Sequence, residues 1–161
     1  MNPVVRFALC LLAASVVVPI EFAVYLYLAG PDLLYGPQLA LAVAWLITFV
    51  HLALLGTPVF ALLLRRGLLN ATSASIAGFL AGALPLGVLG HPSLQQGYSA
   101  TATWYGGRVD LYVNGHPTMC AWLSHLEACL IWGSFGVISA LVFWWVWVAL
   151  NSVAASRAAG A

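Results

Sequence analysis

The chain alternates long apolar runs with short polar interruptions, and this pattern predicts four helices. The apolar runs cover residues 7–29, 38–64, 72–89 and 119–150. A helix needs roughly 20 apolar residues to cross a bilayer. Glycine, proline or arginine residues stand at the interruptions, and Gly and Pro are the residues that most often end helices. The predicted fold class is an all-α membrane protein of four transmembrane helices, with residues 1–161 as a single integral membrane domain.

The first apolar run resembles a secretory signal peptide, because Arg6 precedes its apolar residues. The run is longer than a typical signal core, however, and no convincing small-x-small cleavage site ends it. We therefore expect an uncleaved signal anchor.

The longest interruption, residues 91–117, contains a β-hairpin pattern. Gly106-Gly107 stands between two alternating runs, and a Gly-Gly pair in that setting is a signal for a two-residue turn. The resulting register pairs Tyr105 with Arg108, Trp104 with Val109, Thr103 with Asp110, and Ala102 with Leu111. We expect a small extracytoplasmic β-hairpin between the third and fourth helices.

The same register sorts the hairpin into two faces. One face is apolar and holds Ala102, Trp104, Val109, Leu111 and Val113. An isolated two-stranded hairpin is marginal in water, so this face needs the helix ends, the membrane surface or a partner beneath it. Asn114-Gly115 predicts a second turn, and Thr118 is a candidate N-cap for the last helix.

Composition supports a lipid environment. The chain has 161 residues, of which 63% are hydrophobic and 6% are charged. Soluble domains are about 25% charged, so lipid is the solvent that fits this composition. The net charge of +1 carries no basic footprint for nucleic acid.

The arginines set the expected orientation. Four spans place Arg6, Arg65, Arg66 and Arg157 on one side and Arg108 alone on the other. The positive-inside rule assigns the arginine-rich side to the cytoplasm. We expect a multi-pass protein of the bacterial inner (cytoplasmic) membrane with cytoplasmic N- and C-termini.

Small residues in the third run form a packing motif. Gly78 and Gly82 make a GxxxG pattern that Ala74 extends by one turn. Small side chains let helices approach closely. We favour packing inside one bundle over dimerisation. Pro19 and Pro58 are expected to distort the first and second helices.

Four ionisable residues lie within or near the predicted spans: Glu21, His51, His125 and Glu127. Such residues are costly in hydrocarbon and are functional candidates by default. Glu and His suit proton relay and metal binding, so one hypothesis is an intramembrane polar cluster, with His51, His125 and Glu127 as weak metal candidates. A structural polar network is the second. The third places His125 and Glu127 at the outer surface, if the tryptophans at 144–147 mark the inner interface.

No nucleotide loop, zinc-protease helix, nucleophile elbow or haem-attachment motif occurs. Residues 51–58, 62–67 and 78–85, and more loosely 114–118 and 121–123, resemble small four-span inner-membrane proteins of Gram-negative bacteria. The resemblance covers about half of the chain. It implies a location and a topology, and it transfers no catalytic residue or cofactor.

Three functions remain open. The first is an accessory or assembly subunit of an inner-membrane complex, whose partners are the bilayer and a second copy or another membrane protein. The second is a small proton- or cation-handling transporter component that uses Glu21, His51 and Glu127. The third is a membrane enzyme or a metal- or haem-binding protein. We rank the first highest because it requires least of the residues.

Overall fold

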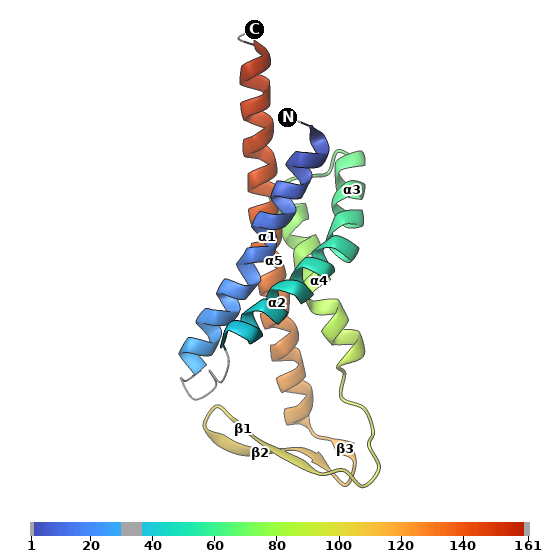
Figure 1. Ribbon diagram of the computed structural model, residues 1–161. Coiled ribbons are helices and arrows are strands. Elements are labelled where there is room, and N and C mark those ends of the chain that lie inside the picture. Colours follow the sequence, from blue (N-terminus) through green and yellow to red (C-terminus); the bar gives the residue numbers. More distant parts are fainter. Residues whose placement is uncertain (1, 30–36, 160–161) are drawn as a thin grey trace.

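The computed structural model describes residues 2–29 and 37–159, except for the side chains of 25, 26, 28, 29, 37–40 and 154–159. Its elements in chain order are α1 Pro3–Ala29, α2 Pro37–His51, the π-helical turn η2 Leu52–Gly56, α3 Thr57–Arg65, α4 Ala71–Leu89, β1 Ala100–Trp104, β2 Gly107–Val113, β3 His116–Pro117 and α5 Met119–Ala159 (Figure 1). The protein is thus mostly helical, with a small sheet at one end.

Four helical segments among the described residues are long and apolar enough to cross a membrane: Pro3–Val24, Leu41–Arg65, Ala71–Leu89 and Met119–Val153. The four predicted apolar helices are confirmed. The last helix runs nine residues beyond position 150, because the alanine-rich sequence that follows favours helix. The predicted break after residue 29 lies largely outside the described residues.

The second helical segment changes geometry midway. After α2 the chain forms η2, and α3 begins at Thr57, directly before Pro58. Proline has no N–H to donate to the preceding turn. The Thr57 N–H donates to the Leu52 carbonyl, and the Thr57 hydroxyl donates to the same carbonyl at 3.3 Å. In α1, by contrast, the helix continues through Pro19.

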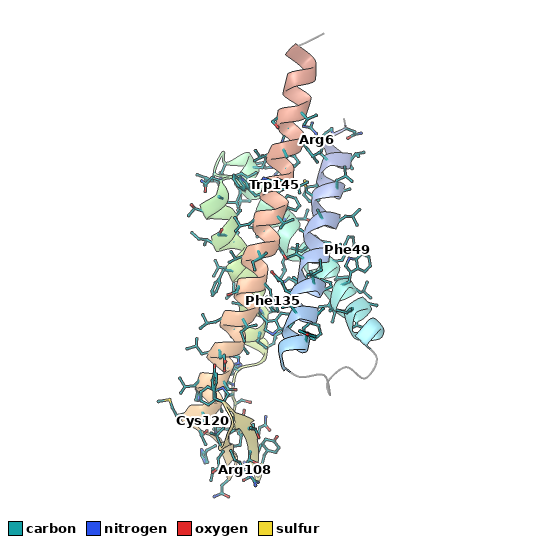
Figure 2. The ribbon with its side chains drawn as sticks, turned by 90° about the vertical axis from the view of Figure 1, so that its left-hand side faces the viewer. Arg6, Phe49, Arg108, Cys120, Phe135 and Trp145 are labelled. Carbon is teal, nitrogen blue, oxygen red and sulfur yellow. The ribbon has the colours of Figure 1, made fainter. Side chains whose placement is uncertain are left out.

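Both ends of the chain lie at one end of the molecule and the sheet lies at the other (Figure 1). Arg6 and Arg108 mark these opposite ends in Figure 2. Near the N-terminal end, Cys10 and Ala14 are fully buried. An aromatic cluster drawn from α1, α3 and α5 surrounds them, formed by Phe7, Phe60, Phe143 and Trp147.

The sheet has three antiparallel strands in the order β1-β2-β3. The predicted register was wrong: Trp104 pairs with Gly107 rather than with Val109, and Thr103 pairs with Arg108. The turn is therefore Tyr105-Gly106, one residue earlier than expected. Both residues have positive φ, 48° and 79°, as a type I′ turn requires. The Gly-Gly pair had placed the turn at Gly106-Gly107, because glycine is the residue that most readily adopts positive φ.

The predicted faces nevertheless hold for most positions. When the turn moves by one residue, each residue of β1 is paired with a β2 residue two positions away from the expected one. Side chains two positions apart on a strand share a face, so the assignment of side chains to faces is unchanged. Ala102, Trp104, Val109 and Leu111 are partly buried. Val113 is the exception: it is exposed, beyond a register irregularity beside Ala100.

The expected second turn and helix cap both form. Asn114 and Gly115 have φ of 50° and 83° and lead into β3, which pairs with β2. The Thr118 hydroxyl accepts from the Ala121 N–H at 3.4 Å and donates to the Asp110 carbonyl at 2.6 Å. The sheet is therefore joined directly to the first turn of α5.

Candidate functional site

The small residues of α4 lie against α5. A Cβ added to Gly78 would fall 2.3 Å from the Gly136 carbonyl oxygen, and one on Gly82 would fall 2.3 Å from the Trp132 carbonyl oxygen. Ala74, one turn earlier, is buried. Side chains larger than hydrogen are thus excluded where the two backbones meet. The GxxxG motif contacts a helix of the same chain.

Glu127 holds the tip of the hairpin. The Trp104 Nε1–H donates to Glu127 Oε2 at 2.7 Å, and the Tyr105 hydroxyl donates to Oε1. The hydrogen bond to Glu127, reinforced by the negative charge of the carboxylate, raises the pKa of Tyr105. Tyr105 occupies a left-handed backbone conformation that non-glycine residues seldom adopt. We call these three side chains the hairpin clasp.

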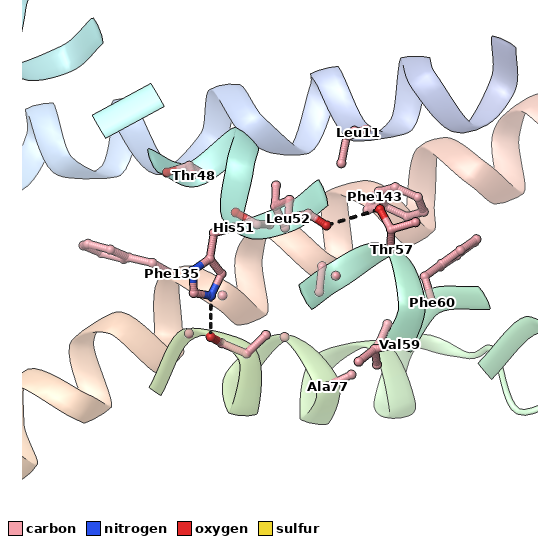
Figure 3. A pocket seen from close by; sticks show the side chains of 18 of the residues that line it. Leu11, Thr48, His51, Leu52, Thr57, Val59, Phe60, Ala77, Phe135 and Phe143 are labelled. Atoms are coloured by element: carbon pink, nitrogen blue, oxygen red, sulfur yellow. Dashed lines mark hydrogen bonds between the residues drawn. The ribbon is translucent and has the colours of Figure 1, made fainter. Parts of the chain in front are cut away.

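His51 and His125 lie in different surroundings. The ring Nε2 of His51 donates to the Ala81 carbonyl of α4 at 2.7 Å (Figure 3). His125 has its Nε2 3.7 Å from the Cys129 sulfur, one turn further along α5, and its ring contacts Trp122 edge-on. Each histidine therefore has its own partners, on separate helices.

Glu21 is the one predicted site residue with no polar contact among the described residues. Both of its carboxylate oxygens are buried and lack a hydrogen-bond partner there. A buried carboxyl group without partners is costly. It is the one carboxyl group in the described part of the chain whose two oxygens are both buried without a partner.

The four predicted residues do not converge. Glu127 contacts the hairpin, His51 contacts α4, and His125 contacts its own helix. In the described ranges no group of three or more His, Cys, Asp and Glu could hold a metal ion. The shared cluster and the weak metal set of His51, His125 and Glu127 are thus not assembled in this structure.

A cavity of about 150 Å³ lies between the α2–η2–α3 segment and the α4–α5 pair, with Leu11 and Val18 of α1 on a third side. Its lining is mostly aliphatic and aromatic (Figure 3). His51 and Ser139 are among its few polar residues. Ser139 is 1% exposed, and among the described residues its hydroxyl has no hydrogen-bond partner.

Sequence reasoning missed Ser139, Trp104 and Tyr105 as site residues. A lone serine in an apolar helix gives no sign of whether its hydroxyl will bond to its own backbone. The hairpin aromatics were assigned to a face, but their carboxylate partner is 22 or 23 positions away. Only the tertiary arrangement identifies these contacts.

Comparison with protein-family models, curated proteins and solved structures found no match for this chain.

Proposed function

We propose that this chain is a four-span integral protein of the bacterial inner membrane that serves as an accessory or assembly subunit. The bilayer part of the proposal is supported by large apolar side chains that face outward on every span. On each span at least one such side chain is more than half exposed, for example Ile20, Ile47, Ile76 and Leu126. In water such faces would be aggregation-prone, whereas in lipid they are covered.

The proposed orientation has both termini in the cytoplasm and the sheet outside. Arg6, Arg65 and Arg66 belong to the end opposite the sheet, and Arg108 belongs to the sheet. Cytoplasmic segments near span ends carry the excess of Arg and Lys. The side chain of Arg157 is outside the described residues, although its position in α5 is at the same end as the N-terminus.

The observation that carries the subunit role is the outer edge of β1. Within the described ranges, β1 forms backbone hydrogen bonds with β2 alone. Exposed edges are usually protected by charge, by proline or by a covering segment. The sequence Ala100–Trp104 contains neither a charged residue nor a proline. An extended segment of another membrane protein, added as a fourth strand, would complete this sheet.

The clasp makes that edge suitable for binding. Glu127 fixes Trp104 at the end of β1, and Thr118 fixes the far end of the sheet to α5. A strand that is already ordered loses little conformational freedom when a partner binds. Because the proposed orientation places the sheet outside, the partner is expected to be an extracytoplasmic segment rather than a soluble cytoplasmic protein.

The test uses affinity purification of the full chain from its native membrane. We expect a membrane protein to co-purify stoichiometrically and to form a photo-crosslink when p-benzoylphenylalanine replaces Thr103, but not when it replaces exposed Thr72 at the opposite end. Lysines at both Thr101 and Thr103 should reduce recovery of that partner at least tenfold, since edge lysines block strand addition.

The matched control places two lysines at Gln95 and Gln96, which adds the same charge outside β1. This variant should retain the partner. Equal recovery of the partner from both double variants, or a wild-type chain that purifies alone, would contradict the proposal.

Proton or cation handling is a second candidate, and Glu21 is the observation in its favour. Its carboxyl oxygens are buried without a partner in the described structure, and intramembrane carboxyls of this kind serve in proton paths. In liposomes, Glu21→Gln should abolish pH-dependent cation flux, whereas Glu127→Gln should retain it because Glu127 is held by the hairpin. Unchanged flux in Glu21→Gln would end this alternative.

A further inference from the structure

The end of the molecule opposite the sheet carries basic side chains that have no acidic neighbour among the described residues. Arg6 lies near the start of α1, and Arg65 and Arg66 stand at the end of α3. The sequence has four acidic residues. Of the three that are described, two belong to the sheet and to the part of α5 beneath it, and Glu21 is roughly 22 Å further along α1 than Arg6. In the described structure, the positive charge of this end is therefore not balanced by the protein.

A groove of about 470 Å³ opens at the same end, between α5 and the connection from α3 to α4. Asn151 and Ser152 are the polar side chains that line it. A Cβ built on Gly67 would meet no atom within 4 Å, so this wall is open rather than packed. The remaining lining is apolar and comes from Leu64, Leu69, Trp144, Trp147 and Val148.

Arginines stand beside both walls of the groove. Arg65 and Arg66 come directly before Gly67 in the chain, and both are exposed. On the α5 wall, Asn151 Oδ1 accepts a hydrogen bond from Nη1 of Arg6, which holds this guanidinium next to a residue that lines the groove (Figure 2). Charges at a protein surface act over about 10 Å at 0.1 M salt. The groove therefore combines an apolar lining with a positively charged rim.

We infer that this groove binds one anionic phospholipid, with the phosphate among the arginines and an acyl chain along the apolar lining. Basic pockets on the cytoplasmic side of membrane helices bind anionic headgroups, and tryptophans are enriched at the level of the headgroups. A zwitterionic lipid would add an ammonium group to a rim that is already positive, so charge favours an anionic lipid. The inference rests on the membrane location in the proposed function and is independent of the partner at the β1 edge.

The test measures lipid binding to the full chain by native mass spectrometry, after purification in detergent and removal of bound lipid. The probes are dioleoyl phosphatidylglycerol, dioleoyl phosphatidylcholine and glycerol phosphate, which is a headgroup without acyl chains. We expect one phosphatidylglycerol per chain, bound at least about tenfold more tightly than phosphatidylcholine, because each arginine near the phosphate favours the anionic lipid. Glycerol phosphate should bind far more weakly, because it cannot use the apolar lining.

Replacing both Arg65 and Arg66 by glutamine should weaken phosphatidylglycerol binding at least about tenfold and leave phosphatidylcholine unchanged. Arg6→Gln should weaken it in the same direction. Arg108→Gln is the matched control, because it removes the same charge at the sheet, and it should bind as wild type does. Ser152→Trp keeps every charge, places a large ring in the groove and should weaken both lipids.

Equal affinity of wild type for the two lipids overturns recognition by charge, and so does an equal loss in Arg108→Gln and in the variant that lacks Arg65 and Arg66. Unchanged phosphatidylglycerol binding in Ser152→Trp overturns the groove. Glycerol phosphate bound as tightly as phosphatidylglycerol would also overturn it, in favour of a free phosphate site. Should Arg6→Gln fail to fold, the exposed Arg65 and Arg66 still decide the assignment. Each of these failures can occur while β1 still captures its partner, so it is distinguishable from failure of the proposed function.

Discussion

The contact between α4 and α5 yields a quantitative prediction for Gly78→Ala. The new Cβ would lie 2.3 Å from the Gly136 carbonyl oxygen and 2.6 Å from the Ala140 Cβ. Overpacking of this kind costs about 1–3 kcal/mol, and the upper end applies because the first obstacle is backbone. Replacing a helical glycine by alanine stabilises the helix by about 1 kcal/mol of unfolding free energy. The net expected loss of unfolding free energy is about 2 kcal/mol.

Gly87→Ala is the matched control on the same helix. Its Cβ would meet only the Cys129 sulfur, at an ordinary 3.8 Å. This variant should be unchanged or stabilised by up to about 1 kcal/mol. The two variants therefore differ by about 3 kcal/mol, which corresponds to more than about a hundredfold in the unfolding equilibrium.

The assay is reversible unfolding of both variants by a denaturing detergent, followed by tryptophan fluorescence. Equal stabilities for Gly78→Ala and Gly87→Ala would refute backbone contact between α4 and α5. A measurement of the monomer mass in the same detergent separates this result from any change in oligomeric state.

Three further predictions concern the hairpin and a helix cap. Glu127→Gln weakens the hydrogen bond from the Tyr105 hydroxyl and removes the negative charge beside it, which together raise the pKa of Tyr105. The pKa should therefore fall toward the ordinary value of about 10. An absorbance titration measures it, with Tyr105→Phe identifying the signal, and an unchanged pKa would contradict the contact. Trp104→Phe removes the 2.7 Å bond to Glu127 and should speed amide exchange in β2 while leaving α4 unaffected; equal exchange in both would count against the clasp. Asn70→Ala removes the capping box formed with Ser73 and should cost about 1 kcal/mol of unfolding free energy, measured by the same detergent titration; no loss would refute the cap.

The sequence allowed the four apolar helices to be predicted because long apolar runs leave few alternatives. Boundaries were nearly correct where a strong signal ends the run. Asn70 and Ser73 form a capping box at the start of α4, one residue before the predicted start. The end of α5 was missed, because residues 151–159 contain four alanines and neither glycine nor proline, so no strong signal ends the helix.

The hairpin shows how a correct pattern can give a wrong register. Alternation fixed the two faces, since side chains two apart share a face. The turn position depended on which residues tolerate positive φ, and Gly106-Gly107 was the expected choice. Tyr105 adopts that conformation instead, and its hydroxyl bonds to Glu127. A contact distant in sequence accompanies the local strain, and local rules contain no information about it.

The candidate sites were the least predictable part. Glu21 and Glu127 were both selected as carboxyl groups in apolar runs, yet one lacks a partner among the described residues and the other binds two aromatic side chains. Helix rotation decides which neighbours a side chain meets, and periodicity alone does not fix rotation between helices. The cavity beside Ser139 depends on the same rotations.

The central claim is a four-span topology with the sheet on the outer side, and cysteine labelling in intact cells tests it most directly. Native Cys10, Cys120 and Cys129 are free thiols and would first be replaced by alanine. Single cysteines would then be placed at exposed Thr103 in β1 and exposed Leu68 between α3 and α4. A membrane-impermeant maleimide should label Thr103→Cys in intact cells and Leu68→Cys only after the inner membrane is opened. Labelling of both from the same side, or of Leu68→Cys alone in intact cells, would contradict the account.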